Sequence, residues 1–341
     1  MLTKKRYNNL SLYRIVAAIL VLQFHIFFVC YPENIAGSIY LSKFVQGLTA
    51  LSGFMLSQKI ILNVKGFYSI KFRKALIPAL IIILSVTFWN LIWMFISQDF
   101  NFFQHFVGYR AYNGRLLIQF GNYYYIFYLL FCYLITPLLQ KSKIGGFFIF
   151  LVAAFVETSV SKWIAPLYIV SAYILGYYIG KVAYRSYTGK YRWTDLIHFS
   201  ISLTATILTI IYSIKLSALP STTTILIGVN ALYTLFGVFS MLAFLMLFKF
   251  CNSLPEIRID KLSYMFFLFN QIFMVGATDI TKVMSNPFEM NVVVLLLVTV
   301  FSIIFYYLYK RIESQATKKK KIIITNKDIE LQNRKIVVES R

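Results

Sequence analysis

Apolar residues gather in long runs along this chain, separated by short polar segments that carry most of the charge. A helix needs about 20 mostly apolar residues to cross a bilayer. The runs that approach this length are 10–30, 44–62, 75–96, 123–139, 144–160, 163–180, 196–214, 223–248, 262–277 and 292–309. The pattern therefore predicts an all-α integral membrane protein, a polytopic bundle of about ten transmembrane helices.

Composition strengthens this prediction, because 59% of the 341 residues are hydrophobic against roughly 45 to 50% in soluble domains. The formal net charge of +22 would point to nucleic acid in a soluble protein. Here the basic residues follow the positive-inside rule. With the N-terminus in the cytoplasm, 27 fall in inside segments and six in outside ones, with Lys43 counted outside and Arg14 within the first helix. We therefore expect a multi-pass cell-membrane protein with both termini in the cytoplasm and no nucleic-acid partner.

No Pro/Gly/Ser-rich linker and no internal repeat divides the chain. The expected organisation is one membrane-embedded domain over 1–310, followed by a cytoplasmic basic tail over 311–341. The three cysteines form no CxxC motif and have no histidine pair beside them. Neither a disulfide framework nor a metal site is expected.

Two ionisable residues share one face of the first helix. Arg14 and His25 are eleven residues apart, close to three whole turns and about 16 Å along the axis. Snorkelling to the headgroups would account for Arg14 alone, and a hydrogen-bonded packing role for His25 alone. Together they indicate a polar path into the bundle. Arginine suits phosphate groups and histidine can act as a general base towards a hydroxyl.

A second basic cluster, Lys71, Arg73 and Lys74, precedes the third apolar run. It is either a positive-inside anchor or, together with Arg14, a cytoplasmic phosphate site. Ser52, in the middle of the second run, is a weaker candidate for a nucleophile because its own segment holds no general base.

Three further charged residues fall near expected outside segments. Glu157 closes the fifth run and either pairs with Lys162 or orients His25 or the acceptor. Arg110 and Arg115 lie in the longest outside segment, and we expect them to face a substrate.

These residues resemble the bacterial membrane acyltransferase 3 family, whose members O-acylate cell-surface sugars. Arg14 and His25 match its Arg-X10-His pattern, the sequence Leu-Ser-Gly-Phe-Met at 51–55 partly matches its Ser-Gly-Phe/Tyr segment, and the basic run 71–74 before Pro78 matches a third motif. The aromatic segment 125–138 with its proline resembles a fourth. The match covers roughly the first 140 residues and is looser beyond them.

The resemblance implies a membrane O-acyltransferase, with acetyl as the expected acyl group. The donor would be a cytoplasmic acyl-CoA such as acetyl-CoA, and the acceptor a hydroxyl of a cell-surface or lipid-linked glycan, often an exopolysaccharide. His25 would be the catalytic base, and Arg14 with Arg73 would position the donor. The competing interpretation is a polysaccharide exporter.

Four positions depart from the family pattern. Thr49 and Ala50 replace paired phenylalanines, Ala75 replaces an arginine of some members, and Asn270 takes the place of a frequent histidine. They leave room for a divergent acceptor or a lost activity.

Overall fold

A computed structural model describes residues 7–30, 35–98, 124–141, 169–220, 222–255, 262–269 and 286–339, together with a few single positions between them. Within these ranges every regular element is a helix and none is a strand. The all-α fold class predicted from the apolar runs is therefore confirmed.

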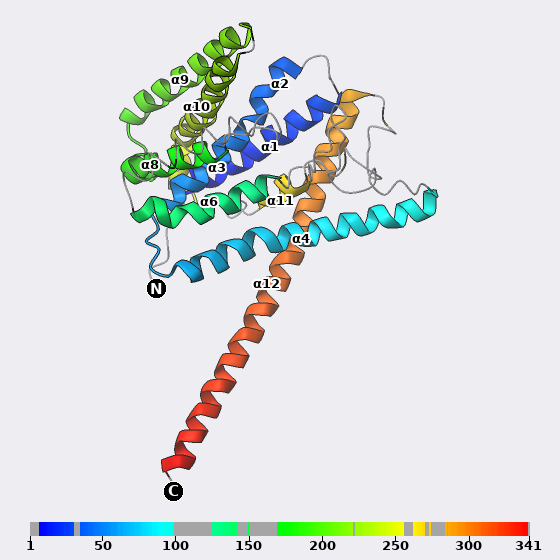
Figure 1. Ribbon diagram of the computed structural model, residues 1–341, viewed down its shortest axis with the longest axis vertical. Helices are drawn as coiled ribbons and strands as arrows, with labels where there is room; N and C mark the ends of the chain where they lie inside the picture. Colours follow the sequence, from blue (N-terminus) through cyan, green and yellow to red (C-terminus); the bar gives the residue numbers. More distant parts are fainter. Residues whose placement is uncertain are drawn as a thin grey trace.

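Helices form over most of the apolar runs that fall within the described residues, and several extend beyond them or end before them. Their bounds are α1 Asn8–Cys30, α2 Ile35–Ser42, α3 Phe44–Leu56, α4 Val64–Ser97, α6 Tyr124–Lys141, α8 Ile169–Thr188, α9 Thr194–Ser217, α10 Thr223–Leu247, the 3₁₀ helix η3 Phe248–Ser253, α11 Leu262–Phe269 and α12 Pro287–Glu339. In Figure 1, α1, α3, α6 and α8 lie together in the body, α9 and α10 form a hairpin at one end, and α12 crosses α4 and extends far beyond the rest. No break in α12 marks the predicted boundary between 310 and 311.

Four stretches of the described residues are long and apolar enough to cross a bilayer: Asn8–Phe27, Thr194–Ser217, Thr224–Ser253 and Pro287–Ser314. The chain is thus a helical protein suited to a lipid bilayer. The expected fifth span, 144–160, lies outside the described residues apart from position 149.

The second expected span, 44–62, differs from the helix that forms. α3 ends at Leu56, and α2 precedes it with one non-helical residue between them, Lys43. Lys43 is 9% exposed and its Nζ lies 4.3 Å from the centre of the Tyr233 ring on α10. The sequence pattern counted Lys43 among the residues outside the membrane, and it did not predict that the side chain is buried against α10.

The basic segment before the third span is also helical. α4 begins at Val64 because the side chain of Asn63 caps it, accepting a hydrogen bond from the backbone N–H of Gly66 at 2.8 Å. Pro78 lies inside the helix. This early start fixes the direction in which Lys71, Arg73 and Lys74 project.

Glycines allow α3 and α8 to pack with their backbones in contact. Gly53 faces the backbone of Tyr173, Gly176 faces Ala50, and Gly180 faces Phe54. Such close approach of small residues is a common device in membrane helices. It places α3, and the pocket residues that α3 carries, against a fixed neighbour.

A group of polar side chains ties the first turn of α1 to distant parts of the chain. The Asn8 side-chain amide donates to the carbonyl oxygens of Cys251, Leu254 and Pro255 at 2.8–3.1 Å. That of Asn9 donates to Tyr187 and Leu245 at 2.7 and 2.9 Å. Beside them the buried Lys249 Nζ lies 2.7 Å from Asp195 Oδ1. These contacts lock α1, α8, η3 and α9 together at one end.

Candidate functional site

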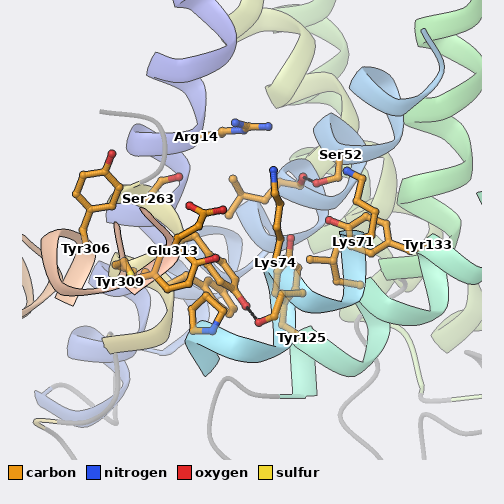
Figure 2. Close-up of a pocket in the computed structure, with 17 residues that line it drawn as sticks. Arg14, Ser52, Lys71, Lys74, Tyr125, Tyr133, Ser263, Tyr306, Tyr309 and Glu313 are labelled. Carbon is orange, nitrogen blue, oxygen red and sulfur yellow. Dashed lines mark hydrogen bonds between the residues drawn. The ribbon is translucent and has the colours of Figure 1, made fainter. Parts of the chain in front are cut away.

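A cavity of about 310 Å³ opens where six helices meet. Its lining comes from α1, α3, α4, α6, α11 and α12, and Figure 2 shows the side chains that point towards it. Apolar residues, among them Leu48, Pro78 and Leu129, form part of its lining. Its volume is at the lower end of the roughly 300–1,000 Å³ of small-molecule sites.

Three cations line one part of this cavity: Arg14 from α1 and Lys71 and Lys74 from α4. The Arg14 Nη2 donates to the Met55 sulfur at 2.8 Å. The Lys71 Nζ lies 4.8 Å from the centre of the Tyr133 ring. The sequence predicted that Arg14 and the basic cluster form one site, and the structure brings three of these four residues together.

The fourth residue, Arg73, is exposed and does not line the cavity. The reason is helical phase, because Lys71, Lys74, Ala75 and Pro78 share one face of α4 and Arg73 falls to the side. The expectation that Arg73 contacts the donor therefore finds no support in the cavity lining.

Hydroxyl groups form another part of the lining, from Ser52, Tyr125, Tyr133, Ser263 and Tyr264. The Tyr264 hydroxyl donates to the Ala75 carbonyl oxygen at 2.7 Å and ties α11 to α4. The Ser52 hydroxyl donates to the Leu48 carbonyl oxygen of its own helix at 3.0 Å. The hydroxyl of Ser52 therefore bonds within α3 while the residue lines the cavity.

The sequence analysis missed the contribution of α12. Tyr306, Tyr309 and Glu313 line the cavity from one face of this helix. Glu313 lies beyond residue 310, in the segment predicted to be a tail. The available signal was the spacing of Glu313 from the two tyrosines, which places all three on one helix face. It was missed because the apolar run was taken to end the helix at 309.

His25 does not line the cavity. It is half-buried on α1, with its ring 5.1 Å from that of Phe24. Between it and Arg14, Ala18 and Val21 are 2% and 1% exposed. The shared helix face predicted from the spacing is thus closed by packing between its two ionisable residues.

Four other predicted positions, Glu157, Arg110, Arg115 and Asn270, lie outside the described residues. Among the described residues no group of three or more His, Cys, Asp or Glu side chains could hold a metal ion.

Two of the positions that depart from the family pattern are buried in α3. Ala50 is fully buried, and its backbone meets α8 at Gly176. The Thr49 hydroxyl donates to the Val45 carbonyl oxygen at 2.9 Å within α3.

Comparisons with protein families, with curated proteins and with solved structures find no significant match to this chain.

Proposed function

We propose that this protein is a membrane O-acyltransferase that takes an acyl group, with acetyl expected, from a cytoplasmic acyl-CoA. The acceptor is a hydroxyl of a cell-surface or lipid-linked glycan. The observation that supports it best is the convergence of Arg14, Lys71 and Lys74 on one cavity from two separate helices.

Three cations around one cavity favour a ligand with several negative charges. Phosphate oxygens accept charge-assisted hydrogen bonds from the arginine fork and from lysine ammonium groups. Among donors of acyl groups, coenzyme A thioesters carry a diphosphate that suits this cluster. The apolar lining residues Leu48, Pro78 and Leu129 would contact the less polar arm of the donor, which leads to the thioester.

In the proposed reaction the acceptor hydroxyl oxygen forms a bond to the thioester carbonyl carbon, and the carbon–sulfur bond breaks. His25 accepts the hydroxyl proton and passes it on to the leaving thiolate, which yields the ester and free coenzyme A. His25 lies about 16 Å beyond Arg14 along α1, and Ala18 and Val21 are buried between them. The thioester would therefore have to reach His25 by a route other than this closed helix face. Glu157 would orient His25 or the acceptor, and Arg110 and Arg115 would contact the glycan.

The proposal includes the finer topology. Ten spans with both termini in the cytoplasm, in a bacterial cytoplasmic membrane, place the cation cluster at the cytoplasmic side, where acyl-CoA is found. This orientation rests on the distribution of basic residues in the sequence.

Donor binding tests the proposal directly. In purified protein, Arg14→Ala and Lys74→Ala should each weaken binding of coenzyme A by about tenfold or more, because each removes a charged hydrogen-bond donor. Lys65→Ala is the matched control, since Lys65 is an exposed lysine of the same helix that does not line the cavity. Equal effects in all three variants would reject the donor site.

The acyl-transfer step is tested in cells. His25→Ala should abolish the alkali-labile ester on the surface glycan and leave the amount of exported glycan nearly unchanged, because a general base contributes about 10²- to 10⁴-fold in rate. Less surface glycan with a normal ester density would instead identify an exporter. If His25→Gln still forms the ester on the surface glycan, His25 is a packing residue and not the general base.

A further inference from the structure

The part of the cavity formed by α12 differs in chemistry from the part formed by α1 and α4. Tyr306, Tyr309 and Glu313 are at positions i, i+3 and i+7, so they lie on one face of α12. Together they present two aromatic rings and one carboxylate. Figure 2 shows Tyr306 and Tyr309 on the opposite side of the cavity from Lys71 and Ser52, with Glu313 between the tyrosines and Lys74. We define these three residues as the α12 wall.

A carboxylate is a poor neighbour for a phosphate. Glu313 would repel the phosphates that the three cations attract. It is the only acidic residue among the described residues that line the cavity. Its position therefore implies that a different portion of the ligand, one that carries hydrogen-bond donors, lies against α12.

Tyrosine rings add a second requirement. Flat π-systems bind the faces of nucleobases, and this stacking contributes about 1–3 kcal/mol per base. Tyr306 and Tyr309 are half-buried and pack against the apolar cluster of α1, α4, α11 and α12. They are consequently held as fixed surfaces rather than as free side chains. A carboxylate beside them accepts hydrogen bonds from ribose hydroxyls or an exocyclic amine.

We propose that the α12 wall is a nucleoside-binding surface, and that the cavity takes a nucleoside diphosphate with its phosphates on Arg14, Lys71 and Lys74 and its nucleoside on Tyr306, Tyr309 and Glu313. This inference rests on the proposed donor site. It adds the nucleoside as the part of the ligand by which the cavity recognises that ligand. Coenzyme A and nucleotide-activated sugars both contain this chemistry.

Inorganic pyrophosphate and ADP separate the two parts of the cavity. Binding of each is measured by titration calorimetry on the full chain purified in detergent. Tyr309→Leu and Glu313→Gln should each weaken ADP binding by about tenfold and change pyrophosphate binding by less than about twofold. Lys74→Met should weaken both ligands by similar factors.

The controls remove the same groups elsewhere. Glu289→Gln removes an exposed carboxylate in the first turn of the same helix, and Tyr212→Leu removes an exposed tyrosine of α9. Neither should change the binding of either ligand. Retained pyrophosphate binding shows that the α12 variants remain folded.

Equal losses of ADP and pyrophosphate in the α12 variants would overturn the nucleoside surface and leave the anion site intact. Wild-type protein that binds neither ligand would overturn both proposals. Comparison of the binding affinities of coenzyme A and UDP distinguishes an acyl-CoA from a nucleotide-activated sugar as the ligand. Tighter binding of UDP than of ADP and coenzyme A, lost in Tyr309→Leu, would support the α12 wall and remove acyl-CoA as the donor.

Discussion

Replacement of Gly176 by alanine tests how the pocket is held in place. A Cβ atom at this position would lie 2.6 Å from the carbonyl carbon and 2.7 Å from the Cα of Ala50, with the carbonyl oxygen nearer still. Ordinary contact begins near 3.4 Å, so the methyl group is short of room by about 0.8 Å against the carbonyl carbon alone. The obstacle is backbone, which cannot rotate away as a side chain would.

The expected cost follows from this geometry. Exchange of glycine for alanine inside a helix normally stabilises by about 0.5–1 kcal/mol. Overpacking a close contact costs about 1–3 kcal/mol and sometimes more. Since α3 and α8 must separate to admit the methyl group, we expect a net loss of about 2 kcal/mol. The displacement also reaches the cavity, because α3 carries Leu48 and Ser52 of its lining.

Thermal stability in detergent, followed as the fraction that stays monodisperse after heating, measures this loss. Gly66→Ala is the matched control, because its Cβ would meet only the side chain of Asn63, at 3.2 Å or more. That variant should lose less stability than Gly176→Ala, because the side chain of Asn63 can shift by a few tenths of an ångström where backbone cannot. If Gly176→Ala proved as stable as Gly66→Ala, the close backbone contact between α3 and α8 would be refuted.

Three further outcomes are expected. Lys249→Met should destabilise the protein by about 3–5 kcal/mol because it strands the buried carboxylate of Asp195, and a second change, Asp195→Leu, should recover part of the loss in the same heating assay. Asn9→Ala should cost about 1–3 kcal/mol by removing two hydrogen bonds to buried carbonyl oxygens, and stability equal to wild type would contradict this role. Topology reporters should read as cytoplasmic after Lys321 and as external at Arg110, and the same reading at both sites would reject the ten-span topology.

The cluster of three cations could be predicted from the sequence, because its formation depends only on which end of each helix a residue occupies. Arg14 follows the start of the first apolar run, and Lys71 and Lys74 precede the third. Placing these helix ends at one side of the membrane brings the three together. It could not separate Arg73 from its neighbours, because that requires the helical phase. The phase is set by the Asn63 cap, eight or more residues upstream.

The features that were missed depend on packing between distant segments. Lys43 looked like a loop residue because it precedes an apolar run, and only its contact with Tyr233 of α10 places it in the interior. Glu313 looked like part of a tail because hydropathy falls after residue 309. Its place in the cavity depends on how α12 crosses the other helices, and no local pattern in the sequence encodes that crossing.

The polar contacts of α1 have a consequence for biogenesis. Asn8 leaves the ribosome long before the three carbonyl oxygens that accept from it, which belong to residues 251–255, some 243 to 247 positions later. Throughout that synthesis the start of α1 must satisfy its amide with water or headgroups at the membrane surface. The Asn8 contacts of α1 therefore form only after residues 251–255 have been made, and a nascent chain halted before residue 251 holds α1 without the contacts that join it to η3 and the residues after it.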